Sequence, residues 1–568
     1  MASNAVTPSG SLPVMYINTE NEAPILSKED YIKGSYYLDA MGIEGLKDFG
    51  SVTDQLPLQI RGRGNYTWVD FEKKPYRLKL DSKAALLGMK KSKHFALLAH
   101  ADDDLGFMRN ATGIELSRRL GLNWTPAAEP VEVVLNGDYI GLYFLTETIR
   151  VDEDRVDIVE QADNETDPDK ITGGWLVEID NYDSDPHVEI YEDGRARTVF
   201  TYKSPEVLSK EQETYLINQM EALDKAIYTS DKSSSEWEKL IDIDQLARYY
   251  IVQEILDDCE SFHGSCYLYK DLGEDQKWNF GPVWDFGNSF HRGGKSKFIY
   301  QDPIFYQTWI GEIAKYPAFQ EKVKEVWKEF AATESKGFYK WVTDEMDRMK
   351  EAAQTDAQRW PNYGNSDMEG RKRRFVELLM GSINWLGAQW GVIIPEPIPD
   401  PMPVIYFRGN FNGWSTSHPF TELPDGTHLL TGLTIKFDGR SQFKIASEFW
   451  DIVDFGATPD SVLELGKPYK LTVKGGDIDL PGSIENGTVR FSYADKTLLI
   501  TDASSGVDKV GEEKSYTLSG QILSAAEYVE VYTPSGVRIW SGTGSVSLQP
   551  SVYIIRSADG SVHKLLVK

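Results

Sequence analysis

The sequence predicts an α+β domain followed by two small all-β domains. Three observations lead to this class. Alternating strand patterns come first, amphipathic helix patterns follow, and short strands with Gly, Asp and Asn turns fill the region after residue 403. The length of 568 residues excludes a single core, because one domain holds about 150 residues.

The front half of the first domain has the pattern of a sheet. In residues 57–80 and 131–149, the runs LQIRG, YRLKL, VEVVL and IGLYFLTE alternate between apolar and polar side chains, as strands do. Asn136 and Gly137 separate two of these runs, and this dipeptide favours the two-residue turn of a β-hairpin. We therefore expect a hairpin at this point of the sheet.

The back half of the first domain is rich in helix patterns. Ser209 with Gln212 forms a capping box before an amphipathic run, and Ser366 with Glu369 forms another. Pro317 fits the first turn of a further helix, where no backbone N–H is needed. A sheet-rich front half followed by a helix-rich back half is typical of a two-lobed α+β domain.

The clearest domain boundary is the proline-rich stretch IPEPIPDPMP at residues 394–403. Proline at alternate positions excludes helix and favours a stiff, extended linker. The predicted organisation is an added or processed N-terminal segment at 1–12, the α+β domain at 13–394, the linker at 395–403, a β-sandwich at 404–502 and a small β-module at 515–568.

Composition narrows the classes of function. With 60 basic and 88 acidic residues the formal net charge is −28, so the mean surface repels phosphate backbones and nucleic-acid binding is not expected.

No run of eighteen apolar residues occurs, so no membrane span is expected. The first ten residues lack the basic and apolar regions of a signal peptide. Cys259 and Cys266 are the only cysteines, too few for a disulfide framework.

The most informative motif is RGRGNYTW at 61–68, followed by KKPYRLKL at 73–80. Two glycines one residue apart let a backbone turn approach a ligand closely, and Lys74, Arg77 and Lys79 add positive charge beside that turn. This combination suits phosphate. The stretch lacks the third glycine of a dinucleotide fingerprint and the GK[ST] of a P-loop, so a β-hairpin with a solvated basic strand is the alternative that the spacing alone favours.

The second motif is WNFGPVWDFG at 278–287, which is similar to the metal-binding DFG of protein kinases. The tripeptide occurs three times in this chain, at Asp48, Asp285 and Asp454, so context has to choose among them. An apolar, aromatic run precedes Asp285, and the acid-rich LDDCESFHGS at 256–265 lies shortly upstream. We therefore expect Asp285 to be the metal ligand.

Three further stretches accompany these motifs: HADDDLGFMRN at 100–110, the strand pair at 131–158 and GGWLVEID at 173–180. Together they resemble the spore coat protein H (CotH) kinase family. The resemblance spans about residues 13–390. It implies an atypical protein-kinase-like fold that uses ATP with Mg²⁺ or Mn²⁺ and transfers the γ-phosphoryl group to Ser or Thr of a protein. The acidic surface suits a protein substrate rich in Lys or Arg.

The resemblance also assigns roles to individual residues. It implies that Gly62 and Gly64 shape the loop over the nucleotide and that Lys74 or Lys79 neutralises phosphate. It further implies that Arg109 with Asn110 supports the site, that Glu147 lies near the nucleotide cleft and that Asp285 binds Mg²⁺.

The chain departs from the family pattern at three positions. Glu260, Ser265 and Gly287 stand where many members have Asp, Asn and a second Asp. Glu can act as the catalytic base and a Ser hydroxyl can ligate Mg²⁺, whereas Gly offers no ligand. Asp257, Asp258 or Asn288 are the residues that could compensate. The alternative function is therefore a kinase-like surface protein that binds nucleotide or glycan without phosphoryl transfer.

The C-terminal regions resemble modules of secreted proteins. FRGNFNGW at 407–414 and FKIASEFW at 443–450 are similar to starch-binding β-sandwiches, which implies that Trp414 and Trp450 stack on sugars and Lys444 hydrogen-bonds them. The alternative for both Trp residues is burial in the core. The tail at 530–568 resembles C-terminal sorting modules, with an ordinary small β-domain as the alternative. Together they favour a secreted or cell-surface bacterial protein that contacts a polysaccharide.

Overall fold

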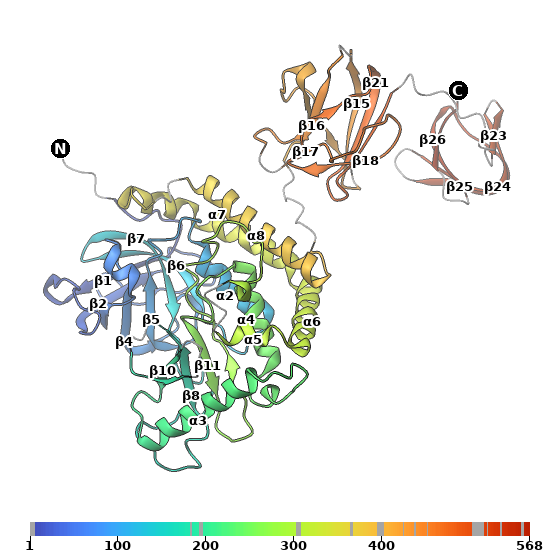
Figure 1. Ribbon diagram of the computed structural model, residues 1–568. Coiled ribbons are helices and arrows are strands. Elements are labelled where there is room, and N and C mark those ends of the chain that lie inside the picture. Colours follow the sequence, from blue (N-terminus) through green and yellow to red (C-terminus); the bar gives the residue numbers. More distant parts are fainter. Residues whose placement is uncertain are drawn as a thin grey trace. The chain divides into compact units, whose positions relative to one another are not determined.

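The computed structural model describes residues 6–181, 185–191, 197–302, 308–363, 367–394, 403–423, 425–436, 439–450, 453–502, 516–519, 521–533, 537–557 and 562–567. The chain divides into two compact units, Met1–Pro397 and Ile398–Lys568. The first combines strands with helices and the second is built of strands (Figure 1), so the predicted order of an α+β region and then all-β structure is confirmed. The predicted linker at 395–403 lies outside the described residues except for its last one.

A closed seven-stranded barrel opens the first unit, with strand order β1-β2-β3-β4-β5-β7-β6. Its core consists of apolar side chains at alternate strand positions, such as Ile60, Leu78 and Phe95. Asn136 and Gly137 both have positive φ, 51° and 80°, and join the last two strands as the predicted hairpin turn. The strands are β1 (Val14–Thr19), β2 (Ile32–Asp39), β3 (Leu56–Gly62), β4 (Tyr76–Ala84), β5 (Ser92–Leu98), β6 (Ala128–Leu135) and β7 (Asp138–Glu147).

A second, antiparallel sheet and a set of helices complete this unit. The sheet has the order β12-β11-β8-β10-β9, made of β8 (Trp175–Ile179), β9 (His187–Ile190), β10 (Thr198–Ser204), β11 (Cys266–Lys270) and β12 (Asn279–Phe280). The α-helices are α1 (Tyr66–Asp70), α2 (Met108–Leu120), α3 (Lys210–Ile227), α4 (Ile243–Leu256), α5 (Trp309–Ile313), α6 (Pro317–Thr333), α7 (Ser335–Arg359) and α8 (Met368–Trp390). Sheet and helices share one large apolar core, which also includes the outward side chains of β5 and β7.

Helix starts follow the capping chemistry that the sequence predicted. Ser209 accepts a hydrogen bond from Gln212 N in a complete capping box at α3, and Pro317 occupies the first turn of α6. At α8 the cap is Asp367, which accepts from Gly370 N. Ser366, the predicted cap of that helix, lies outside the described residues.

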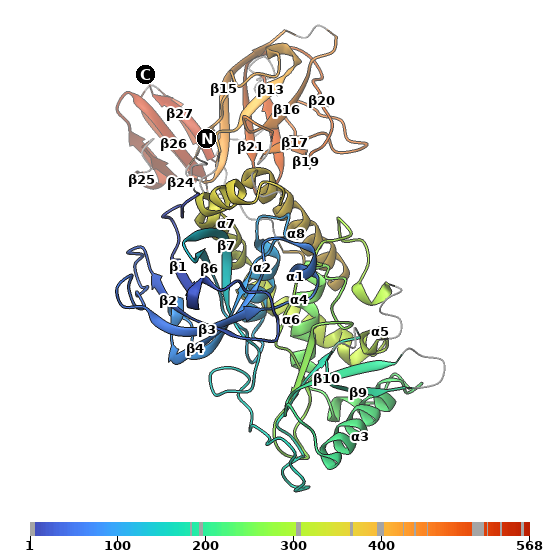
Figure 2. The same ribbon diagram turned by 90° about the vertical axis from the view of Figure 1, so that its left-hand side faces the viewer.

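A buried ion pair joins the barrel to α7, which runs beside β7 in both ribbon views (Figure 1 and Figure 2). Lys73 Nζ lies 2.7 Å from Asp356 Oδ1, and the same oxygen accepts from Leu142 N at 2.8 Å. Gly141 makes this approach possible, because a Cβ at that position would lie 2.2 Å from Asp356 Oδ1. The barrel is therefore held at a fixed point against the helices.

The second unit contains two separate apolar cores. A sandwich pairs the sheet β13-β16-β17-β19, with β20 on β16, and the sheet β14-β15-β21-β22-β18, around Phe407, Phe443 and Phe491. A further sheet, β23-β24-β26-β27 with β25 on β24, has its own core. The strands are β13 (Tyr406–Gly409), β14 (Thr421–Glu422), β15 (Thr427–Ile435), β16 (Gln442–Ala446), β17 (Asp454–Gly456), β18 (Tyr469–Lys470), β19 (Thr472–Val473), β20 (Ile478–Asp479), β21 (Ile484–Ser492), β22 (Thr497–Thr501), β23 (Tyr516–Ser519), β24 (Ile522–Tyr532), β25 (Arg538–Ser547), β26 (Ser551–Ser557) and β27 (Val562–Val567).

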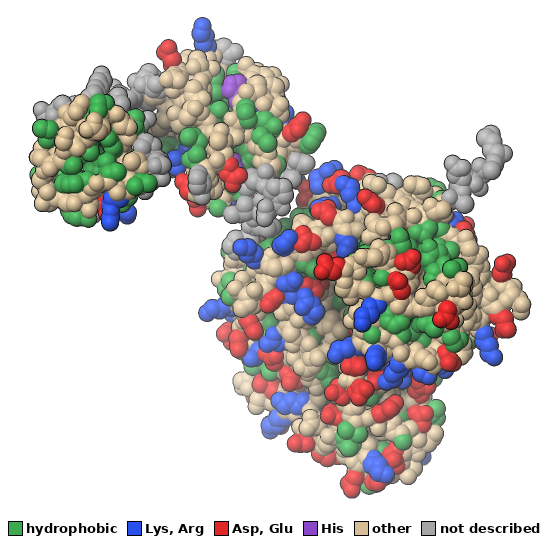
Figure 3. Space-filling model, turned by 180° about the vertical axis from the view of Figure 1, so that it is seen from behind, with side chains coloured by type: hydrophobic (Ala, Val, Ile, Leu, Met, Phe, Trp, Pro, Cys, Tyr) green, Lys and Arg blue, Asp and Glu red, His purple; other side chains and the backbone are tan. Residues whose placement is uncertain are grey.

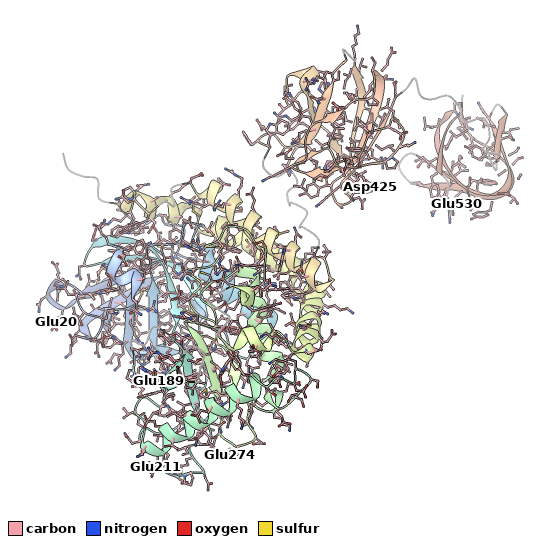
Figure 4. The ribbon with its side chains drawn as sticks, in the orientation of Figure 1. Glu20, Glu189, Glu211, Glu274, Asp425 and Glu530 are labelled. Carbon is pink, nitrogen blue, oxygen red and sulfur yellow. The ribbon has the colours of Figure 1, made fainter. Side chains whose placement is uncertain are left out.

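The acidic excess is dispersed over the surface. Figure 3 shows Asp and Glu interspersed with Lys and Arg over the face of the first unit that it presents. Glu20, Glu189, Glu211 and Glu274 project from four separate segments of that unit (Figure 4). Within the described ranges, no helix is both long and apolar enough to cross a membrane.

Candidate functional site

Asp285 follows β12 in a loop whose backbone places it in the left-handed region, with φ of 55°. Its side chain is exposed to solvent, and Gly287 N approaches its Oδ1 at 3.4 Å. The crowding of protein atoms around the carboxylate raises its pKa, the negative charge of Glu260 raises it further, and Arg63 opposes both effects. The carboxylate that the sequence singled out therefore lies between an acid and a base from distant segments.

The end of α4 brings further carboxylates to Asp285. Asp258 is buried and accepts a hydrogen bond from Glu260 N at 3.2 Å. Burial raises the pKa of Asp258 strongly, and the charges of Glu260 and Asp285 add to that rise. The Glu260 carboxylate itself accepts a hydrogen bond from Asn288 Nδ2. The two residues predicted as catalytic, Glu260 and Asp285, are thus brought together.

Asp102 is a member of this group that sequence reasoning did not single out. It lies between β5 and α2, and a Cβ at Gly287 would lie 3.4 Å from Asp102 Oδ2 and 3.4 Å from Asp285 Oδ1. Burial raises the pKa of Asp102 to about 6, with Asp103 and then Asp285 among the charges that contribute. We call Asp102, Asp258, Glu260 and Asp285 the acidic cluster. The run of three Asp residues in HADDD was the sequence signal that could have indicated Asp102.

Arg109 and Asn110 anchor the loop that carries Asp285 and Gly287. Arg109 Nε donates to Ser289 O at 2.9 Å, while its two terminal nitrogens bind Asp103 and Asp104 at 3.1 and 2.6 Å. Asn110 Oδ1 accepts from Phe286 N at 2.9 Å. The start of α2 therefore fixes the loop on both sides of Gly287.

A buried network underlies the acidic cluster. Lys295 is fully buried at its side chain and contacts both Glu254 of α4 and Asp257, the residue that caps α4. Glu254 Oε1 also accepts from Ile299 N at 3.0 Å. Because Asp257 directly precedes Asp258, Lys295 fixes the backbone from which Asp258 and Glu260 extend.

Four cations lie on the barrel side, and we call Arg63, Arg77, Lys79 and Arg150 the cation group. Arg63 is the member whose charge acts on Asp285. Burial lowers the pKa of His94 to about 4, and Arg150, Arg77 and Lys79 lower it together. Arg63 lies over the Trp284 ring at 5.7 Å and near both Arg77 and Asp285. No described carboxylate lies within salt-bridge distance of Arg77, Lys79 or Arg150. The group is thus a local basic region in an acidic protein, which favours an anionic ligand.

The two lysines proposed for phosphate have different surroundings. Lys79 is exposed and shares the outer face of β4 with Arg77, because Leu78 and Leu80 fill the barrel interior. Lys74 Nζ donates to Trp68 O at 2.5 Å and lies 5.6 Å from the centre of the Trp68 ring. The structure therefore places Lys79 in the cation group and Lys74 within its own loop.

The glycines of RGRG shape the loop that carries Arg63. A Cβ at Gly62 would lie 2.4 Å from the Trp68 ring, so Gly62 makes room for that indole. Gly64 has φ of 82° and precedes α1, a conformation that favours glycine.

Glu147 and Ser265 lie at the ends of strands. Both Glu147 oxygens accept backbone hydrogen bonds, from Lys90 N at 3.1 Å and Ala127 N at 3.0 Å, and Arg155 adds an ion pair at 2.9 Å. These contacts hold β7 against its neighbours. Ser265 immediately precedes β11 with φ of 51°. Within the described part of the chain, no contact joins its hydroxyl to Asp285.

The oxygen donors present fit a magnesium ion that arrives with a nucleotide. Among the described residues, no group of three or more His, Cys, Asp or Glu side chains encloses a metal position. Mg²⁺ is usually held by one or two carboxylates, waters and the phosphates of its substrate. The space that a Gly287 Cβ would fill is bordered by Asp102 and Asp285, and Arg63 lies beside Asp285, so this place suits that donor set.

The residues predicted to bind glycan lie together in the sandwich. The rings of Trp414 and Trp450 are 5.8 Å apart and both are half-buried. Arg408 lies over the Trp450 ring at 4.0 Å, and Lys444 contacts the same ring at 5.6 Å while pairing with Asp454. Trp414, Lys444 and Trp450 thus form one polar and aromatic patch.

The CotH kinase protein family matches this chain over residues 59–379. The match covers more than half of the 568 residues, and the chain belongs to that family. A comparison with curated proteins gives no match. The matched range contains both the cation group and the acidic cluster.

Proposed function

We propose that this chain is a protein kinase that uses ATP with Mg²⁺ or Mn²⁺ and phosphorylates Ser or Thr of a protein. The observation that carries the proposal is that Arg63, which lies beside Arg77 of the cation group, also lies beside Asp285 of the acidic cluster, within the family-matched range. Phosphoryl transfer needs positioning and neutralisation of phosphate charge more than covalent chemistry. The barrel would supply the cations and the helical part the carboxylates, as in a two-lobed kinase.

Each side of the site has a separate task in this proposal. Arg77, Lys79 and Arg150 would hold the phosphate oxygens, with Arg63 nearest to the carboxylates. When bound, the metal ion supplies neutralising charge at the transferred group. Glu260, oriented by Asn288, would accept the proton of the substrate hydroxyl.

The substrate and the location belong to the same proposal. An acidic kinase surface favours a protein substrate rich in Lys or Arg. We place the protein outside the bacterial cell or on its surface, on the resemblance of the C-terminal modules to those of secreted proteins.

A transfer assay with γ-labelled ATP and Mg²⁺ or Mn²⁺ tests the activity. We expect labelling of the chain itself or of a basic acceptor protein, and its loss in Asp285→Asn. Asp48→Asn is the matched control, because Asp48 belongs to another DFG tripeptide and its side chain, among the described residues, bonds to Ala40 N alone. Full activity of Asp285→Asn would contradict the assignment of that residue.

The alternative is nucleotide or glycan binding without transfer. The departures at Glu260, Ser265 and Gly287 favour it, since Ser265 makes no described contact with the acidic cluster. ATP would then raise the thermal midpoint while no label is transferred. A ligand at one hundred times its dissociation constant adds about 2.7 kcal/mol of stability. Any acid-stable protein label that depends on Asp285 would exclude this alternative.

Glycan binding is a second proposed activity, favoured by the convergence of Trp414, Trp450 and Lys444. Sugar rings stack on aromatic faces, and half-buried indoles can offer such faces. Calorimetry with an α-glucan oligosaccharide should show binding that Trp414→Ala and Trp450→Ala remove. Trp540→Ala, in the separate last sheet, is the control and should bind as the unmodified chain does.

A further inference from the structure

We propose that Asp102 is the second carboxylate ligand of the metal site and that Gly287 keeps open the space between Asp102 and Asp285. The inference rests on the proposed use of Mg²⁺ with ATP. It gives a different interpretation of Gly287, which stands where many members of the family have Asp. The missing Asp at that position is replaced by a carboxylate from another segment of the chain.

The first support is geometric. The Cβ position of Gly287 is 3.4 Å from Asp102 Oδ2 and 3.4 Å from Asp285 Oδ1, so the two oxygens are at most twice that distance apart. A carbon atom there would occupy the space that both carboxylates border. An ion with ligand distances of about 2.1 Å binds both carboxylates once their oxygens are within about 4 Å of each other.

The second support is that Asp102, unlike its two acidic neighbours, makes no ion pair with a described residue. Of the three consecutive acids, Asp103 and Asp104 both bind Arg109, and Asp103 also accepts from Leu105 N. Among the described residues, no side chain of another residue bonds to the Asp102 carboxylate. The neighbours whose charges act on it include Asp285 and Arg109.

The third support is that the remaining ligands can come from the nucleotide. Mg²⁺ usually combines one or two carboxylates with waters and substrate phosphates, so waters and phosphate oxygens would complete the coordination. Arg63 lies beside Asp285, and Arg77 lies beside Arg63, so phosphates held by the cation group would reach the two carboxylates.

Mn²⁺ binding to the full chain, measured by calorimetry and by electron paramagnetic resonance with and without ATP, tests the proposal. We expect Asp102→Asn and Asp285→Asn each to weaken Mn²⁺ binding about tenfold or more, a loss that even an outer-shell partner can cause. Gly287→Ala should weaken it as well, because its methyl group enters the shared space.

The controls are Asp48→Asn and Gly294→Ala, the latter at a loop glycine whose Cβ would meet nothing within 4 Å. Thermal midpoints check that each variant folds, and Asp102→Ser replaces Asp102→Asn if that variant is unstable. Unchanged Mn²⁺ affinity in Asp102→Asn, with loss in Asp285→Asn, would overturn the inference and leave the proposed function standing. Absence of Mn²⁺-ATP binding by the unmodified chain would overturn both.

Discussion

Arg63 of the RGRG motif lies beside Asp285 of the WDFG motif. Burial lowers the pKa of Arg63, and the charge of Asp285 opposes that shift. The pKa of Asp285 shows the converse effect: burial and the charge of Glu260 raise it, and the positive charge of Arg63 lowers it. Two motifs that lie far apart in the sequence therefore meet where the cation group and the acidic cluster adjoin.

This relationship predicts that Arg63→Gln weakens ATP binding more than it slows transfer. The change removes a positive charge next to the phosphates, and we expect KM for ATP to rise about tenfold, the effect of about 1.4 kcal/mol. Steady-state kinetics at several salt concentrations measure it. Arg61→Gln is the control, because Arg61 contacts Tyr31 and Glu29 on the outside of the site. Equal effects of the two variants would contradict the role given to Arg63.

Lys295→Met should destabilise the first unit by about 3–5 kcal/mol, because it leaves Glu254 and Asp257 buried without their cation. Urea unfolding followed by tryptophan fluorescence measures the change. Lys297→Met is a matched control two residues away, since its pair with Asp302 is partly exposed and should contribute less than about 1 kcal/mol. A loss of similar size in both variants would be inconsistent with the buried network.

His94 predicts a pH dependence of stability. Its pKa in the folded state is about 4 and its ordinary value is 6.5, so the unfolded chain binds the proton more readily between these values. Stability should therefore fall as the pH drops from 6.5 towards 4. His94→Gln should lose this part of the acid sensitivity, as unfolding at pH 7 and pH 4.5 would reveal. An unchanged pH slope in the variant would contradict the lowered pKa of His94.

Gly141→Ala should destabilise the joint between the barrel and α7 by about 3 kcal/mol or more. Its φ is 113°, and the added methyl would lie 2.2 Å from Asp356 Oδ1. Gly137→Ala separates the effect of the positive φ from that of the close contact, because Gly137 also has a positive φ, of 80°, but has open space around its Cβ position. We expect about 1 kcal/mol for Gly137→Ala, measured by the same unfolding curves. A smaller loss in Gly141→Ala than in Gly137→Ala would disagree with the tight contact.

Local chemistry made several elements predictable. The turn at Asn136 and Gly137, the capping box at Ser209 and the helix start at Pro317 depend on a few adjacent residues, and all three are confirmed. The order of an α+β region and then all-β structure follows from patterns of period 3.6 and period 2, which do not require tertiary contacts.

The candidate site was only partly predictable, because it forms from loops that meet through tertiary packing. Motifs in the sequence indicated Glu260 and Asp285. The relevance of Asp102 and Arg150 depends on which residues lie near them in the folded chain, and the sequence does not show this. The choice between Lys74 and Lys79 depended on whether Trp68 folds back over the loop. Gly287 looked like a lost ligand because the sequence cannot show which carboxylates border it.

The contact among Lys73, Asp356 and Gly141 has a mechanical consequence. Because there is no room there for even a methyl group, the barrel and α7 cannot slide along each other at this point without breaking a buried ion pair.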